Sequence, residues 1–237
     1  MADPLPLLQL RGIRKSFGAT QALTGVDLDL HPGQIHAIVG ENGAGKSTLM
    51  KVLAGIHTTD TGDMQLDGAP YAPRGPIEAR RAGVVMVNQE LAIAPHLTVA
   101  ANIVLGAEPS RGTWLDARGT RSIASAALTQ LGRADIPLDK PAGELGIAEQ
   151  QLIEIARALA TGCRALVLDE PTSSLTNTDT RNLFSLCRRL RDQGTAIIYI
   201  SHFLEEVTAL TQHCTVLRDG TTVHSAPTAD LDAAAIA

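Results

Sequence analysis

The chain has 237 residues, of which 44% are hydrophobic and 19% are charged. Such a composition supports a buried core and excludes an intrinsically disordered chain, and the length fits one large domain or two small ones. The formal net charge of -5 weighs against a nucleic-acid-binding protein, because phosphate backbones attract basic surfaces.

The N-terminal part of the chain predicts strands followed by a helix. Its start, MADPLPLLQLRG, lacks the basic residues and apolar core of a secretory signal. Apolar and polar residues alternate over 26–30, which predicts a half-buried strand. The turn at 31–33 leads into a short apolar run over 35–40, which predicts a fully buried strand. A helix is predicted to begin within GENGAGKST and to continue through LMKVLAG.

The middle of the chain changes from strand to helix signals. MQLDGAPY predicts a hairpin, because Asp67-Gly68 is a strong turn pair. From 90 to 162 apolar residues recur mainly at helical spacing, as they do in LIEIARALA. No apolar run reaches the roughly 20 residues that a membrane-spanning helix needs.

Strand signals return in the last third. The apolar runs 165–169 and 196–201 predict buried strands, with an amphipathic helix around LFSLCRRLR between them, and 214–225 predicts a second hairpin. Strands that alternate with helices predict an α/β fold with a mostly parallel sheet, to which the hairpins add an antiparallel flank. The three cysteines, at 163, 187 and 214, lack metal-site spacing, so we expect buried thiols in a reducing, cytoplasmic compartment.

A phosphate-binding loop is predicted between the buried strand at 35–40 and the following helix. The segment matches G-x-x-x-x-G-K-[ST] in full. Glycines let backbone N–H groups approach phosphate oxygens, and the helix directs its positive end at the same anion. We expect Lys46 to bridge the β- and γ-phosphates and the Ser47 hydroxyl to bind Mg²⁺. The residues expected in this site are Gly40, Glu41, Asn42, Gly43, Ala44, Gly45, Lys46, Ser47 and Thr48.

Two carboxylates follow the buried strand ALVLD. Asp169 and Glu170 would lie at the carboxyl edge of the sheet, where α/β folds bind their ligands. We expect Asp169 to hold Mg²⁺ and Glu170 to act as the general base on the attacking water. An Asp-Glu pair alone is a weak signal, and its position after a buried strand in a chain with a complete phosphate loop makes it a strong one.

The ordered set of motifs resembles the nucleotide-binding domains of ABC transporters, from about Leu7 to about Leu231. It comprises the phosphate loop, GELGIAEQQ, DEPT and three isolated residues at positions 17, 89 and 202. More narrowly, VGENGAGKSTLMKVLAGI, VNQELAIAPHLTVAANIVLG and YISHFLEEV resemble the first half of monosaccharide importers of the ribose, xylose and galactose type.

The resemblance implies roles for those isolated residues. Phe17 would stack on adenine, although it could instead be an ordinary core phenylalanine. Gln89 would reach the Mg²⁺ and the attacking water and would sense the membrane subunit. His202 would contact the γ-phosphate, although a lone histidine is more often structural.

The resemblance also implies a P-loop NTPase fold with a mostly parallel core sheet, an antiparallel β flank and an inserted α-helical subdomain. We expect residues 1–88 and 163–237 to form the core with its antiparallel part, and 90–162 the helical subdomain. Together they would make one ATPase domain, the first half of a longer protein.

The segment Leu145–Gln151 aligns with the signature by which one ABC domain covers the ATP of its partner. Glycine at 146 replaces a serine, and alanine at 148 replaces a glycine. Gly146 has no hydroxyl to donate to a γ-phosphate, a bond worth about 1.5–3 kcal/mol when charge-assisted. We therefore expect an asymmetric pair, in which this chain has a complete site of its own and weakly covers the second one. Thr176, where many members have aspartate, is interpreted as a subfamily trait.

The leading hypothesis is a peripheral ATPase at the cytoplasmic face of the membrane that uses ATP and Mg²⁺ to power sugar uptake. Its implied partners are a second ABC ATPase domain, membrane permease subunits and, indirectly, a sugar-binding protein, with no nucleic acid. One alternative is a soluble ABC-type ATPase acting on nucleic acid or ribosomes, which the lack of heptads and basic runs disfavours. Another is a regulatory module that binds nucleotide without turnover, which the retained Glu170 disfavours.

Overall fold

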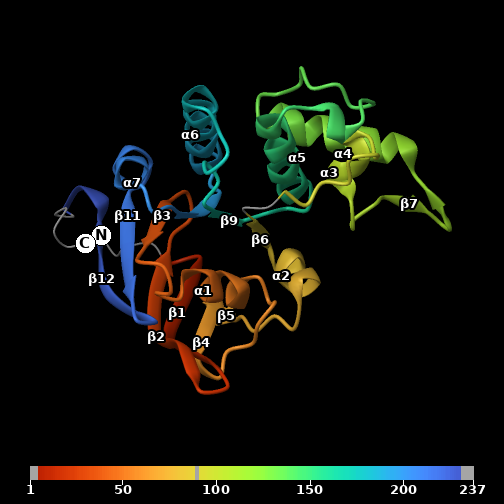
Figure 1. The fold of residues 1–237 in the computed structure, drawn as a ribbon. Helices are drawn as coiled ribbons and strands as arrows, with labels where there is room; N and C mark the ends of the chain where they lie inside the picture. The colour runs from red at the N-terminus through yellow and green to blue at the C-terminus, as the bar shows by residue number, and fades with distance from the viewer. Residues whose placement is uncertain (1–4, 89–90, 231–237) are drawn as a thin grey trace.

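A sheet of ten strands runs through the computed structural model, which describes residues 5–88 and 91–230 (Figure 1). The strand order is β5-β4-β1-β2-β12-β11-β3-β10-β9-β6. The strands are β1 Leu8–Phe17, β2 Thr20–Leu30, β3 Ile35–Val39, β4 Thr61–Leu66, β5 Ala69–Pro70, β6 Val84–Val87, β9 Ala165–Asp169, β10 Ala196–Ile200, β11 His213–Arg218 and β12 Thr221–Pro227.

The strands that lead to the predicted site are parallel. β3 pairs with β10 and β11, and β9 pairs with β10 and β6, all in parallel. The pairs β1–β2, β1–β4, β4–β5 and β11–β12 are antiparallel. Because parallel strands end at one edge, the residues that follow β3, β9 and β10 are brought to the same side of the molecule.

Seven α-helices and two short 3₁₀ turns lie in the described ranges. They are α1 Lys46–Leu53, α2 Pro76–Ala82, α3 Val99–Val104, α4 Ala117–Gln130, α5 Ile147–Ala160, α6 Asn177–Asp192, α7 Leu204–Leu210, and the turns η1 Ala142–Glu144 and η2 Thr228–Asp230. Helices α3, α4 and α5 gather on the side of the molecule away from β1 and β2 (Figure 1). A two-stranded hairpin, β7 Ser110–Arg111 with β8 Trp114–Leu115, projects from this side.

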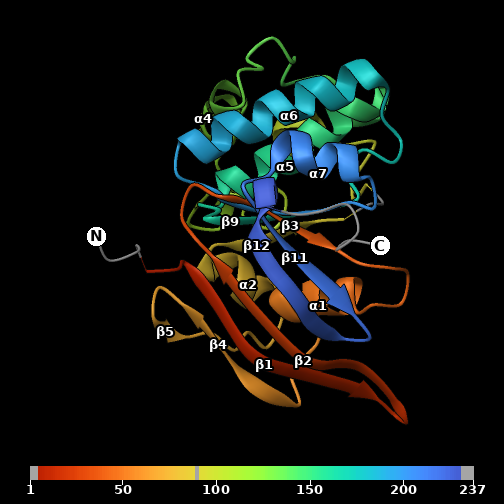
Figure 2. The same ribbon diagram turned by 90° about the vertical axis from the view of Figure 1, so that its left-hand side faces the viewer.

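Both faces of the parallel strands are buried, which explains why their sequences are continuous apolar runs. On one face Leu166, Leu168 and Ile197 pack in a core with α3–α6. On the other face Val167 and Ile198 join a second core with α1 and the antiparallel strands. Figure 2 shows α5, α6 and α7 above the sheet and α1 between the two groups of strands.

The structure confirms the mostly parallel α/β fold and its antiparallel flank, with differences at element ends. The helix after the phosphate loop ends at Leu53, because Gly55 takes a left-handed conformation with φ 71°. The strand predicted over 196–201 ends at Ile200. Cys187 and Cys214 are buried, as expected, but Cys163 is only half-buried. The β7–β8 hairpin was not predicted, since each strand has only two residues.

None of the helices in the described part of the chain is long and apolar enough to cross a membrane. The division into a core and a helical subdomain at 90–162 remains a prediction.

Candidate nucleotide-binding site

Three glycines shape the loop between β3 and α1. A Cβ on Gly40 would overlap the carbonyl oxygen of Leu217, and one on Gly45 would lie 2.6 Å from the carbonyl oxygen of Ala22. Gly43 has φ 88°, and a Cβ there would meet nothing within 4 Å. Packing therefore requires glycine at 40 and 45, whereas at 43 the backbone conformation requires it and the missing side chain leaves open space.

The loop presents unpaired backbone donors at the start of α1. Within the described chain, the N–H groups of Gly43, Gly45 and Lys46 make no hydrogen bond. The Ser47 hydroxyl also has no partner in this part of the structure, and its side chain is exposed. Thr48 follows, half-buried. Orphan donors at a helix N-terminus form an anion-binding site, so the loop fits a phosphate.

Lys46 reaches back into the loop. Its residue is 7% exposed, and its Nζ donates to the carbonyl oxygens of Gly40 at 2.5 Å and Glu41 at 2.9 Å. Burial lowers the pKa of Lys46, while Glu170 and Asp169 act to raise it. An ammonium has three protons to donate, so one remains for a phosphate oxygen.

Asp169 and Glu170 follow β9, as predicted. Asp169 is half-buried, and burial raises the pKa of its carboxyl, with Glu170 adding to the shift and Lys46 opposing it. Glu170 has φ 43°, a left-handed conformation that costs a non-glycine residue about 1–2 kcal/mol. Its N–H donates to the carbonyl of Ile200 at 3.1 Å, which ties the strained residue to β10. Backbone strain of this kind clusters at functional sites.

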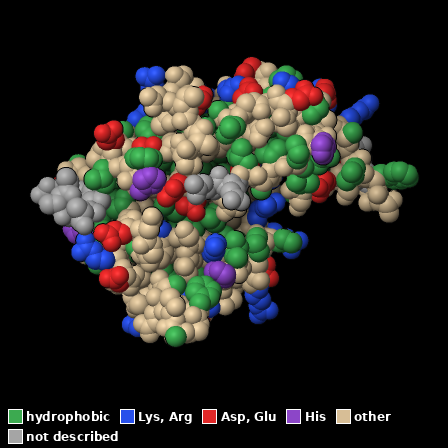
Figure 3. Space-filling model, viewed as in Figure 1, with side chains coloured by type: hydrophobic (Ala, Val, Ile, Leu, Met, Phe, Trp, Pro, Cys, Tyr) green, Lys and Arg blue, Asp and Glu red, His purple; other side chains and the backbone are tan. Residues whose placement is uncertain are grey.

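His202, just after β10, lies beside Glu170. Its Nδ1 is 3.3 Å from Glu170 Oε1, and its side chain is half-exposed. A hollow of about 340 Å³ is lined by Gly40, Glu41, Asn42, Glu170 and His202. On the face drawn in Figure 3, acidic side chains lie next to a histidine near the middle, at the level of β9. The structure thus brings the loop, the acidic strand end and the histidine together.

The turn that contains His202 is stabilised by hydrogen bonds of residues that the sequence analysis did not single out. Glu206 Oε2 accepts from Ser201 Oγ at 2.7 Å and from Tyr199 Oη at 2.8 Å, and Ser201 Oγ accepts from the N–H of Phe203 at 3.0 Å. The sequence does contain a signal for Glu206, because it is an acidic residue in the first turn of a helix that follows a polar strand end. The sequence gives no signal for its partner Tyr199, because a tyrosine within β10 fits the apolar pattern of a buried strand.

Phe17 lies on the surface. It is 45% exposed, its ring meets that of His57 edge-on with centroids 5.0 Å apart, and Lys15 Nζ lies 5.6 Å from its centroid. The alternative of an ordinary core phenylalanine is therefore wrong. The stacking role itself is not tested by these contacts.

Gln89 lies outside the described residues. No group of three or more His, Cys, Asp or Glu side chains in the described ranges could hold a metal ion. Of the predicted magnesium ligands, Ser47 and Asp169 are described, and a hydroxyl and a carboxylate together with phosphate oxygens are donors that suit this metal.

The variant segment at 145–151 forms the start of α5. Gly146 is the N-cap, with extended backbone and no side-chain hydrogen bond, and a Cβ there would meet nothing within 4 Å. Glu149 is held by Arg133, with Oε1 3.2 Å from Nη2. Gln151 Nε2 donates to the carbonyl of Pro171 at 2.8 Å. The segment is linked to the acidic strand end, and a serine would fit at 146.

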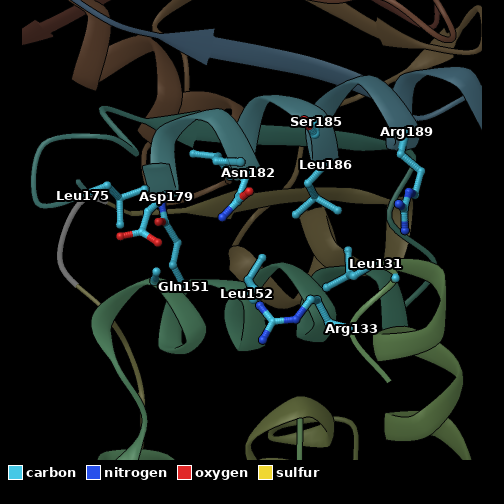
Figure 4. Close-up of a pocket in the computed structure, with 13 residues that line it drawn as sticks. Leu131, Arg133, Gln151, Leu152, Leu175, Asp179, Asn182, Ser185, Leu186 and Arg189 are labelled. Atoms are coloured by element: carbon cyan, nitrogen blue, oxygen red, sulfur yellow. The ribbon is translucent and has the colours of Figure 1, made fainter. Parts of the chain in front are cut away.

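A separate hollow of about 470 Å³ lies between α5, α6 and the end of α4. Figure 4 shows Asn182 and Leu186 of α6 facing Leu152 of α5 across it, with Arg189 at one end. None of the predicted nucleotide-site residues lines this hollow.

The sequence matches known proteins. The family model described as ABC transporter matches residues 23–173. A ribose import ATP-binding protein of Streptomyces avermitilis is 46% identical over 225 residues, covering 94% of this chain and 44% of the relative. Another, of Yersinia pestis, is 50% identical over 231 residues, covering 98% of this chain and 45% of the relative. The chain thus spans less than half the length of these relatives.

Solved structures have the same fold. One is an ATP-binding cassette of an ABC transporter in its ADP conformation, with a TM-score of 0.84, 25% identity and coverage of 98% of both chains. Another is a nucleotide-free cassette from an ABC transporter, with a TM-score of 0.82, 26% identity and coverage of 94% of this chain and 92% of the other.

Proposed function

This chain belongs to the ABC transporter family, and from that premise we propose that it binds ATP with Mg²⁺ and hydrolyses it to power the import of a simple sugar. The observation that carries the proposal is the convergence of Lys46, Asp169, Glu170 and His202 on one sheet edge beside a loop of unpaired amides. The ribose import named for the relatives supports the substrate class.

In this proposal the loop amides and the free proton of Lys46 hold the β- and γ-phosphates. Magnesium, held by Ser47 and Asp169, would neutralise phosphate charge. Glu170 accepts the proton of the attacking water, and its contact with His202 holds it in position and leaves that imidazole near the γ-phosphate. Phe17 stacks on the adenine, where its exposed face is available. Gln89 reaches the metal and the water.

We further propose that the chain works in an asymmetric head-to-tail pair. The partner is a second ATPase domain, and the length of the relatives suggests that it belongs to the same longer protein. The partner's signature covers the complete site of this chain, while the 145–151 segment, without a serine hydroxyl at 146, covers the second site weakly. Residues 1–88 and 163–237 make the core, and 90–162 the helical subdomain.

The proposed partners also include membrane permease subunits and, indirectly, a sugar-binding protein, with the ATPase peripheral at the cytoplasmic face. Import ATP-binding proteins among the relatives support this placement.

Two substitutions test the site. Lys46→Ala removes the buried ammonium and is expected to abolish ATP binding, measured by calorimetry, while Lys140→Ala, whose side chain makes no hydrogen bond in the described structure, leaves it unchanged. Glu170→Gln is expected to bind ATP but to hydrolyse it about 10²–10⁴-fold more slowly in the assembled pair, with Glu108→Gln as the exposed control. Normal turnover in Glu170→Gln would reject Glu170 as the base.

A further inference from the structure

A polar cluster outside the nucleotide site joins α5 to the segment 92–98. Arg157 of α5 donates through Nε to the carbonyl of Asn102 at 2.7 Å and through Nη1 to the carbonyl of Ala92 at 3.0 Å. Its Nη2 lies 3.3 Å from Asn102 Oδ1. One guanidinium therefore contacts both ends of the chain that runs from the segment into α3, in a fork geometry that lysine lacks.

Asn102 holds the segment from the other side. It is fully buried, and its Oδ1 accepts from the N–H of Ala94 at 2.9 Å. Its Nδ2 donates to the carbonyls of Ala94 at 2.9 Å, Leu97 at 3.2 Å and Thr98 at 3.1 Å. The segment is also tied to 141–143 by an isolated antiparallel bridge and by backbone bonds to Leu97 and Pro95. The Asn102 amide therefore adds side-chain partners to a backbone that is only partly paired.

Glu154 is the third member of the cluster, and only one of its two carboxylate oxygens has a hydrogen-bond partner there. Its Oε1 accepts from the N–H of Ala92 at 2.5 Å, but its Oε2 is buried and has no partner among the described residues. Burial raises the pKa of this carboxyl, with Ala92 and Arg157 opposing the shift. A hollow of about 220 Å³ adjoins it, lined among others by Asn88 and Arg80. A half-satisfied buried carboxylate destabilises a fold, so its presence is better explained by a role than by stability.

We propose that Glu154, Arg157 and Asn102 form a clamp that makes α5 and the segment 92–98 move as one body. The clamp lies in the C-terminal half of α5. At the rise of a regular helix, Gly146 at the N-terminus is about 12 Å from Glu154 and about 16 Å from Arg157 along the axis. If the proposed function holds, that N-terminus covers the partner's ATP, while the clamped segment follows directly on the part of the chain expected to sense the membrane subunits. The clamp would then transmit closure of the pair to the transporter's membrane part, with the three residues acting as positioning residues.

The first test concerns the clamp alone and uses this chain without partners. Glu154→Ala is expected to raise hydrogen exchange of the Ala92 amide about tenfold or more, because a bond to a charged acceptor is lost. Glu154→Gln keeps a carbonyl acceptor and is expected to retain the protection, with Glu108→Gln as the exposed control. Unchanged exchange at Ala92 in Glu154→Ala would overturn the clamp.

The second test measures coupling in the complete transporter, reconstituted in vesicles. Arg157→Lys keeps the charge and loses the fork, and it is expected to lower sugar uptake per ATP hydrolysed about tenfold while ATP hydrolysis itself changes little. Arg118→Lys, an exposed arginine on α4, is the matched control. Equal losses of uptake and hydrolysis would show a merely structural role and refute the coupling. If wild-type transporter hydrolyses ATP without taking up sugar, the proposed function fails instead, and exchange at Ala92 alone decides whether the clamp exists.

Discussion

His36 predicts a loss of stability in mild acid. The residue lies on β3 with no exposed surface, and its Nε2 is 2.8 Å from Thr215 Oγ1, while its Nδ1 has no partner in the described structure. Burial lowers its pKa from 6.5 to about 3, with a smaller contribution from His213, whose ring centroid is 5.0 Å away. The backbone and the charge of Asp29 favour the charged form of His36, and His31 disfavours it.

The sign follows from proton binding. Below its ordinary pKa the unfolded chain binds a proton at His36 that the folded chain does not, so acid favours unfolding. The contribution of His36 to stability is complete above about pH 6.5 and is lost progressively as the pH falls toward 3. At pH 5, which is about 1.5 units below the pKa of the unfolded chain, the protein has lost about 2 kcal/mol of unfolding free energy through His36.

Urea denaturation followed by circular dichroism at pH 7 and pH 5 measures this loss. Other groups also titrate, so the informative quantity is the difference between variants. His36→Gln, which keeps a polar group for Thr215, is expected to lose about 2 kcal/mol less than wild type between the two pH values. The exposed His224→Gln is the control and is expected to behave as wild type. If His36→Gln and wild type lose the same stability within the error of the extrapolation, the buried neutral imidazole is not responsible.

Other expectations concern the glycines at the two helix starts. Gly45→Ala is expected to lower the free energy of unfolding by about 2–3 kcal/mol, since a Cβ there meets a backbone carbonyl, as a urea titration would detect. Gly43→Ala is expected to cost only about 1 kcal/mol in the same titration, yet to weaken ATP binding in calorimetry, because its methyl group enters the open space of the loop. If Gly45→Ala and Gly43→Ala lowered the free energy of unfolding by the same amount, the distinction between packing at 45 and open space at 43 would be wrong. Gly146→Ser adds a capping hydroxyl and is expected to raise stability by a few tenths of a kcal/mol. In the assembled pair it should leave hydrolysis at this chain's own site unchanged, and a large rise there would defeat the asymmetry.

Buried strands and the phosphate loop were predictable because local sequence determines them. The run at 35–40 is apolar except for His36, and 165–168 is apolar throughout, since the structure covers both faces of β3 and β9. The loop was predictable because glycine positions and one lysine are dictated by backbone geometry. The spacing of the glycines and the lysine is local and therefore visible as a pattern, whereas the contacts of Gly40 with Leu217 and of Gly45 with Ala22 are not.

Contacts between distant residues were not predictable. Glu206 supports the turn at His202 through a tyrosine that matches an apolar pattern. Arg157 and Asn102 are 55 positions apart, and nothing in either neighbourhood indicates that they meet. The order of the ten strands in the sheet was not predictable either. A helix pattern between two strand patterns shows that the strands are connected by a helix, but it does not show which strands pair.

Trp114 is the one tryptophan of the chain, and it is 80% exposed on the small projecting hairpin. Apolar side chains are visible at that end of the molecule in Figure 3. Its indole is already in water in the native protein, so intrinsic emission will change little when the interior melts. The same placement makes it a built-in optical probe for anything that settles on the hairpin, which would shift the emission to the blue without any added label.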